Sequence, residues 1–123
     1  MARLILISND GSVGGVGFAY NTLIFDVISE GTRAKSPPQE HDCLKKCYED
    51  LDEMGSEYIC LYYVNARCFS AFLSASEKGI QELSDNKGVA IDYAISDSEI
   101  VGIVDLWNEL IDALRRDPRN EVH

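Results

Sequence analysis

The 123-residue sequence lacks both a long hydrophobic run and a leader-like start. A membrane-spanning helix needs about 20 consecutive apolar residues, and the apolar runs here are much shorter. The chain passes from Arg3 directly into a short apolar run, without the charged, apolar and cleavage regions of a signal peptide. We therefore expect a single domain over residues 1–123, with no membrane segment and a cytoplasmic location.

Metal-ligand spacings are also scarce. The four cysteines, Cys43, Cys47, Cys60 and Cys68, contain no Cys-x-x-Cys pair, and the two histidines lie far apart. A metal site made by Cys43, Cys47 and the nearby His41 is one alternative. The pattern favours buried, reduced thiols that act as small apolar residues.

Positive charge is the third shortage, with 11 Lys and Arg against 21 Asp and Glu and a formal net charge of −10. A protein that grips phosphates non-specifically carries the opposite sign. An acidic surface serves solubility, or it attracts a basic partner over a long range. The charge therefore argues against nucleic-acid binding, and carboxylates that hold Mg²⁺ would explain only a few of the excess acids.

Two apolar runs near the N-terminus predict strands. Residues 3–8 form the first, which ends at the turn sequence NDGS. The next run is rich in β-branched and aromatic residues, so we expect strands over about 15–21 and 23–29. A helix over 21–30, ended by Gly31, is the competing interpretation.

The rest of the chain predicts alternating helices and strands. Residues 36–55 begin with Ser36 and two prolines, carry acids in the first turn and repeat apolar residues at helical spacing, which predicts a helix. The later elements are expected to be a strand over 57–64 in the centre of the sheet, a helix over 70–83, a strand over 89–95 and a helix from a cap at Asp97 or Ser98 to Asp117. The order βββαβαβα is typical of a mixed α/β domain.

The last helix has the clearest periodicity. Its apolar stripe is predicted to consist of Ile100, Ile103, Val104, Trp107, Leu110, Ile111 and Leu114. Trp107 lies in the middle of this stripe and is expected in the core.

Four glycines follow the first strand within the segment SNDGSVGGVGFAY, residues 8–20. A P-loop would need a Lys followed by Ser or Thr, and nothing basic lies between Arg3 and Arg33. A dinucleotide fingerprint would need its glycines to open a helix, whereas the residues after Gly17 are typical of a strand. The segment therefore predicts a hairpin turn.

This hairpin resembles the first hairpin of the ribonuclease H family, in which a strand ends in Asp-Gly-Ser before a glycine-rich turn. Two further stretches fit in the same order. Glu40 is followed by small or apolar residues three, four, seven and eight positions on, and YYVNARCFSAF places Asn65 where the family has Asp. The resemblance covers about residues 3–75 and implies a ribonuclease H-like mixed sheet.

The resemblance also implies two-metal hydrolysis of the RNA strand of an RNA/DNA hybrid, with Mg²⁺, or alternatively Mn²⁺, as cofactor. Asp10 would bridge the two ions, Glu40 would hold one of them, and Asn65 would occupy the third position. The fourth carboxylate is expected in the C-terminal helix, where the candidates are Asp97, Glu99 and, in the body of the helix, Asp105, which completes the expected site. Alternatively, this helix resembles an internal helix of bacterial family members, and the fourth ligand is missing. Because the Asn65 amide offers an oxygen but no charge, this enzyme would be impaired or inactive.

Each of these residues also has a structural interpretation. Asp10 suits a turn, Glu40 complements the dipole of a helix, and Asn65 suits a helix N-cap. The alternative function is a non-catalytic acidic binding protein, such as an immunity protein or an inhibitor that neutralises a basic nuclease toxin. The enzyme requires a pocket where these side chains converge, whereas the binding protein requires a contiguous acidic surface.

Overall fold

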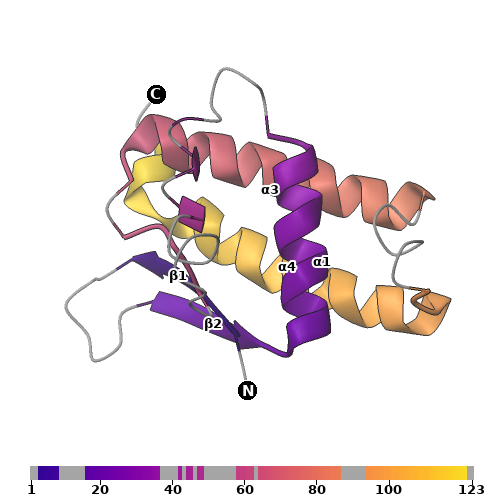
Figure 1. The fold of residues 1–123 in the computed structure, drawn as a ribbon. Helices are drawn as coiled ribbons and strands as arrows, with labels where there is room; N and C mark the ends of the chain where they lie inside the picture. Colours follow the sequence, from indigo (N-terminus) through magenta and orange to yellow (C-terminus); the bar gives the residue numbers. More distant parts are fainter. Residues whose placement is uncertain are drawn as a thin grey trace.

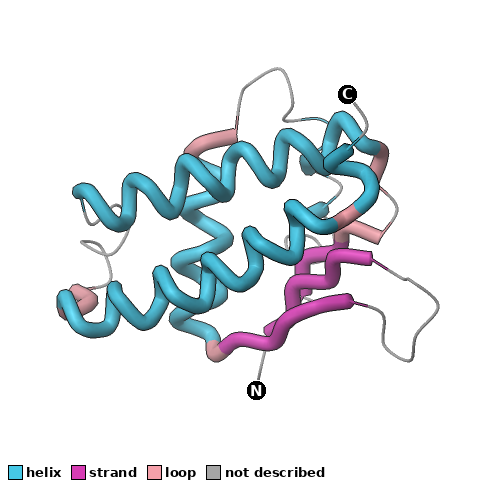
Figure 2. Tube along the Cα trace, turned by 180° about the vertical axis from the view of Figure 1, so that it is seen from behind, coloured by secondary structure: helices cyan, strands magenta, loops and turns pink. Residues whose placement is uncertain are grey.

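The computed structural model describes residues 3–8, 16–36, 42, 44–45, 47–48, 58–62, 64–86 and 94–121. Three long helices dominate this part of the chain: α1 (Thr22–Ala34), α3 (Ala66–Asn86) and α4 (Asp97–Arg116). Figures 1 and 2 show α3 and α4 side by side in opposite directions, with α1 crossing them. The sheet lies toward the end where α3 begins and α4 ends, so the opposite end of this helix pair projects beyond the sheet.

The described sheet has three strands in the order β2-β1-β3. β1 (Arg3–Ser8) is central; it pairs antiparallel with β2 (Val16–Tyr20) and parallel with β3 (Tyr58–Cys60). The predicted strands at 3–8 and 15–21 are confirmed. The strand expected over 57–64 is present in part, as β3. In the described sheet β1, not this strand, is central, because β3 pairs there with β1 alone.

The strand predicted over 23–29 is wrong, because these residues lie in α1. The Asn21 side chain accepts a hydrogen bond from the backbone N–H of Ile24 at 2.9 Å and caps the helix. Phe25, Ile28 and Thr32 then recur at helical spacing, and all three are buried. Packing of this face outweighs the strand preference of the β-branched residues.

The two later helices agree with the expectation, apart from their boundaries. The cap of α4 lies one residue before the nearer of the two expected caps, because Ser96 and Glu99 form a reciprocal capping box. Asp117 ends α4, as expected, through its backbone N–H to the Leu114 carbonyl. In the helix predicted over 36–55, residues 42, 44, 45, 47 and 48 are helical, whereas Ser36 is not. The other residues of this segment lie outside the described part of the chain.

The expected order βββαβαβα is wrong. The third element is α1 rather than a strand, and α3 is followed by α4 among the described elements. Ala94 and Ile95, the predicted end of a strand over 89–95, are not in a strand, and the rest of that segment lies outside the described residues.

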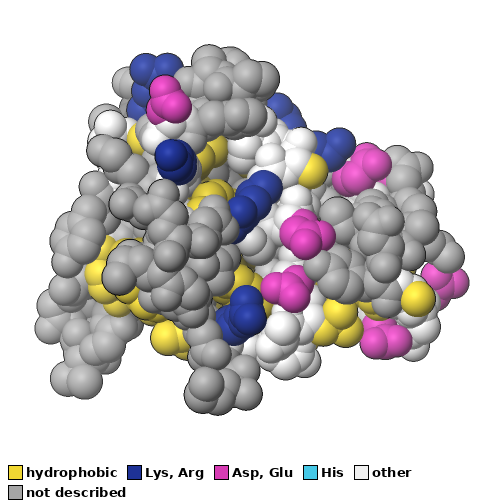
Figure 3. Space-filling model, viewed as in Figure 1, with side chains coloured by type: hydrophobic (Ala, Val, Ile, Leu, Met, Phe, Trp, Pro, Cys, Tyr) yellow, Lys and Arg dark blue, Asp and Glu magenta, His cyan; other side chains and the backbone are white. Residues whose placement is uncertain are grey.

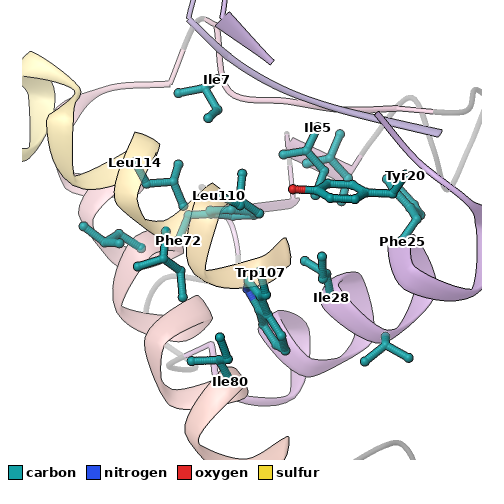
Figure 4. Packing of buried hydrophobic residues seen from close by; sticks show 14 of the residues in the cluster. Ile5, Ile7, Tyr20, Phe25, Ile28, Phe72, Ile80, Trp107, Leu110 and Leu114 are labelled. Carbon is teal, nitrogen blue, oxygen red and sulfur yellow. The ribbon is translucent and has the colours of Figure 1, made fainter. Parts of the chain in front are cut away.

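Trp107 joins the three helices in one core. Its side chain is fully buried, in line with its place on the predicted stripe, and Figure 4 shows it beside Ile28 and Ile80. A Cβ on Gly31 or on Gly79 would lie 2.8 Å from the Trp107 Cη2 atom. The indole therefore packs onto the bare backbones of α1 and α3 at the point where these helices meet.

The Arg119 clamp fixes the end of α4 to the sheet. We use this name for Arg119 and the groups that its guanidinium contacts. It donates to the carbonyls of Ile7 (2.7 Å), Val64 (3.1 Å) and Leu61, and to both carboxylate oxygens of Asp117 (3.0 and 3.1 Å). Its central carbon also lies 4.2 Å from the centre of the Phe69 ring. The clamp thus joins the ends of β1 and β3 to the chain that leaves α4.

Asp117 makes the clamp sensitive to acid. Burial by itself would raise the pKa of this carboxyl, but hydrogen bonds from the Arg119 side chain and backbone, together with its charge, outweigh burial and lower the pKa. A lowered pKa contributes stability that is present above the pKa of the unfolded carboxyl, about 3.9, and is lost as the pH falls through the folded value.

We therefore expect the wild-type protein to be more stable than Asp117→Asn at pH 7 and to lose that advantage below about pH 4. Urea unfolding of both proteins between pH 3 and pH 7 measures the difference. The exposed Asp105→Asn is the control and is expected to show no such convergence. A gap between wild type and Asp117→Asn that stays constant with pH would contradict the role given to Asp117.

Among the described cysteines, two are free thiols and one is not. Cys47 is buried, and burial, followed by the nearby Cys60, raises the pKa of its thiol to about 12. Cys60 is partly exposed. Cys68 is disulfide-bonded, so the expectation of a reduced thiol is wrong there.

Among the helices that the structure describes, none is both long enough and apolar enough to cross a membrane.

Candidate interaction surface

Of the four site residues expected from the ribonuclease H resemblance, the structure describes two. Asn65 precedes α3, and Asp105 is exposed on the solvent side of α4. Asp10 and Glu40 lie outside the described residues, so their convergence stays a prediction. Within the described ranges, no group of three or more His, Cys, Asp or Glu side chains is arranged to hold a metal.

Asn65 is the N-cap of α3. Its side-chain oxygen accepts a hydrogen bond from the backbone N–H of Cys68 at 2.9 Å, and its backbone carbonyl accepts one from Phe69 at 2.9 Å. The side-chain bond satisfies one of the N–H groups that a helix start leaves without intrahelical partners. The structural interpretation of Asn65 as a cap is therefore confirmed.

The cap predicts a specific mutational pattern. Asn65→Ala is expected to lower the free energy of unfolding by about 1 kcal/mol, whereas Asn65→Asp keeps a capping oxygen and most of the stability. Asn108→Ala, an exposed change inside α4, is the matched control and is expected to leave stability equal or slightly higher. Urea denaturation measures all three, and an Asn65→Ala protein as stable as wild type would contradict the cap.

The solvent side of α4 carries negative charge along most of its length. Five exposed acids lie between the helix start and its last turn, with no Lys or Arg among them: Asp97, Glu99, Asp105, Glu109 and Asp112. The helix's own bases, Arg115 and Arg116, come only in the last turn. There Arg115 pairs with Glu77 at 2.8 Å and with Asp112 at 3.6 Å. The first half of α4 therefore carries exposed acids and no base.

Local structure explains part of this charge. Acids in the first turn of a helix interact favourably with its dipole, and the Glu99 carboxylate also accepts from the Ser96 hydroxyl at 2.8 Å in the capping box. Asp105 and Glu109 lie beyond the first turn, so neither reason covers them. Helix capping and the helix dipole therefore do not account for these two acids.

Apolar surface lies next to these acids. Val101 is 61 % exposed, the larger of the two exposed fractions found for large hydrophobic side chains in the described part of the chain. A hollow of about 250 Å³, here called the α1-side hollow, lies between α4 and the start of α1 and is lined by Leu23, Ile24 and Leu106 among others. A second hollow of about 220 Å³, the α3-side hollow, includes Leu83 and Val101.

Both hollows border the end of the molecule that projects beyond the sheet. Figure 3 shows acidic and hydrophobic side chains next to each other at this end. An apolar centre with a charged rim is the usual composition of a protein-binding surface. Covalent chemistry needs a nucleophile, an acid–base pair or a metal in a common pocket, whereas the described hollows offer contact area and charge.

Part of this surface can be predicted from the sequence. Val101 is absent from the predicted apolar stripe of α4, which is a signal that an apolar residue lies on the solvent side. The α1-side hollow has no such signal, because the residue pattern favours a strand at Leu23 and Ile24, and their contact with α4 depends on how α1 crosses it.

Comparisons with known proteins give one structural likeness. Neither a protein-family model nor a curated protein sequence matches the chain. The fold is similar to that of a chain from the solved complex of a CdiA-CT toxin from Burkholderia pseudomallei E479 with its cognate CdiI immunity protein. The TM-score is 0.77 and the sequences are 20 % identical; the match covers 96 % of this chain and 98 % of the other. At this level of sequence identity, the similarity is evidence for a shared fold alone.

This likeness corrects the family expected from the sequence. A ribonuclease H-like fold is wrong, because nearly the whole chain superposes on a chain of the toxin–immunity complex and the described sheet has three strands. The motifs that suggest ribonuclease H are short and rich in turn and cap residues. Asn65 shows how such a motif arises for a structural reason, because it caps a helix.

Proposed function

We propose that this chain is an immunity-type protein that binds a basic toxin and neutralises it. The observation that carries the proposal is the solvent side of α4, where acids from Asp97 to Asp112 are exposed with no intervening base. The likeness to a chain of a toxin–immunity complex supports a partner that is itself a protein. The proposed activity is therefore binding.

The charge supports the immunity protein rather than the toxin as the member of such a pair that this chain resembles. A toxin that attacks nucleic acid approaches a polyanion, which favours a basic surface. A protein that covers this basic surface binds it more favourably if it is acidic. This chain has a formal net charge of −10. The same charge weighs against an RNA or DNA ligand.

Opposite net charges would also make neutralisation fast. Electrostatic steering raises protein association rate constants from about 10⁵–10⁶ to as much as 10⁸–10⁹ M⁻¹s⁻¹ at low salt. A cell that contains a toxin gains from fast capture, because the toxin acts until it is bound.

A growth experiment tests the proposal. The chain is expressed in bacteria alone, together with the protein encoded by the gene next to its own, or not at all. We expect the neighbouring protein to arrest growth, the chain alone to leave growth unchanged, and the two together to restore it. An unrelated acidic protein of similar charge is the control and is expected not to restore growth.

Two outcomes would contradict the proposal. Growth arrest by the chain alone would make it the toxic member of a pair. Failure of the folded chain to restore growth against a toxic neighbour would show that it does not neutralise the toxin, and the proposed function would be wrong.

A further inference from the structure

We propose that the basic partner docks on the first half of α4, over the two hollows that flank this helix. The inference rests on the proposed function and adds where the partner binds and what it presents. The occupant is a segment of a basic protein that inserts apolar side chains beside α4 and surrounds them with Lys or Arg. Its apolar contacts give affinity, and its charges give speed and orientation.

The hollows have the size and lining for side chains of a protein. Their volumes, about 250 and 220 Å³, are below the roughly 300–1,000 Å³ typical of small-molecule sites. The α1-side hollow is lined by Leu23, Ile24, Ile103 and Leu106. Apolar walls of this kind bind an apolar side chain by removing it and themselves from water.

The two hollows belong to one surface. Val101 lines the α3-side hollow, and its neighbour Gly102 lines the α1-side hollow, so the ridge of α4 separates them. Because Val101 is 61 % exposed, a partner seated on the ridge would bury it while reaching into both hollows. The start of α4 belongs to the end of the helix pair that projects beyond the sheet (Figure 1).

The charges around the two hollows favour a basic partner. Glu99 lines the α1-side hollow, Asp97 lines the α3-side hollow, and Asp105 is exposed one turn beyond Val101. The Arg residues of α4 lie at the other end of the helix. A partner segment with Lys or Arg around its apolar contacts is therefore attracted, whereas an acidic protein is repelled.

Gly102 allows the hollow to be blocked without disturbing the fold. A Cβ at Gly102 would have no heavy atom within 4 Å, so Gly102→Phe adds a ring in open space at the α1-side hollow. Ser74→Phe is the matched control, because it adds the same ring at an exposed position near the middle of α3. Both proteins are expected to unfold at denaturant concentrations close to that of wild type.

Asp105 allows the charge to be tested separately. Asp105→Lys reverses one exposed charge beside the hollows, and Glu30→Lys makes the same change on α1, seven residues beyond Leu23. Reversal near the docked segment should lower the association rate more than the same reversal elsewhere.

The test measures binding of the purified protein encoded by the neighbouring gene, by calorimetry and by stopped-flow association. We expect Gly102→Phe to weaken binding at least tenfold and Ser74→Phe to leave it within about twofold. Asp105→Lys is expected to slow association by about tenfold, with Glu30→Lys close to wild type.

The possible results distinguish a wrong docking surface from a wrong immunity role. If wild type binds and restores growth, but Gly102→Phe and Asp105→Lys behave like their controls, the docking surface is wrong and the immunity role stands. If wild type neither binds nor restores growth, both are wrong. If only Asp105→Lys weakens binding, the partner uses the acids without entering the α1-side hollow, and the docking mode proposed here is wrong.

Discussion

Gly79→Ala is expected to destabilise the protein by about 3 kcal/mol, a large part of the stability of a domain of this size. A Cβ there would lie 2.8 Å from Trp107 Cη2 and 2.9 Å from the backbone oxygen of Gly31. Both neighbours are held rigidly, one as a fully buried ring and the other as helix backbone. Relief would require α1 and α3 to separate, which would also move Trp107 and α4.

Gly102→Ala is the matched control, because it makes the same change inside a helix. A Cβ at Gly102 would meet nothing within 4 Å, so the change is expected to stabilise the protein by up to about 1 kcal/mol through helix propensity. Urea unfolding of both variants gives the comparison. If Gly79→Ala proves as stable as Gly102→Ala, the close contact among α1, α3 and Trp107 is wrong.

Arg119→Ala is expected to cost about 3–5 kcal/mol, the range for removing one member of a buried ion pair. The Asp117 side chain is only 4 % exposed, so its carboxylate would lose the charged partner that compensates for its burial. The carbonyls of Ile7, Leu61 and Val64 would lose a donor at the same time. The end of α4 would then no longer be tied to the sheet.

A conservative change at Arg119 and a change at an exposed Arg outside the clamp identify the cause of this loss of stability. Arg119→Lys keeps the charge but cannot reproduce the fork of N–H donors, so it should recover only part of the stability. Arg116→Ala removes an exposed Arg from the last turn of α4 and should change stability by less than about 0.5 kcal/mol. Thermal and urea unfolding measure all three variants. An Arg119→Ala protein that differs from wild type by no more than Arg116→Ala does would contradict the clamp.

Elements whose pattern is local can be predicted from the sequence. A short apolar run before a turn predicts β1, and the apolar stripe around Trp107 predicts α4 together with its buried face. The prediction for 23–29 is wrong because its β-branched residues favour a strand, whereas the Asn21 cap and the contact of α1 with α3 favour a helix. Propensity is the weaker effect there.

Contacts between distant segments cannot be predicted in this way. Gly79 is one of nine glycines in the sequence, and only the meeting of α1, α3 and α4 shows why a side chain does not fit. Arg119 likewise looks like an ordinary surface base near the C-terminus. Its role depends on the carbonyls of Ile7 and Leu61, which lie 112 and 58 residues away.

The sign of the charge on the candidate surface can be predicted from the sequence, but the position of the surface cannot. A net charge of −10 is compatible with a basic partner, as it is with solubility. The position of that surface depends on Leu23 and Ile24 lying beside Leu106, which requires α1 to be a helix. The ribonuclease H resemblance points to Asp10 and Asn65 instead, and Asn65 serves as a helix cap.

The salt dependence of association between this chain and the protein encoded next to it tests the proposed binding most directly. Stopped-flow measurement at about 0.05 M and 0.5 M NaCl changes the screening of long-range attraction with little effect on apolar contacts. We predict a stable complex whose association rate falls at least tenfold at the higher salt concentration. The absence of a complex, or an association rate that does not change with salt, would contradict electrostatic binding of a basic partner.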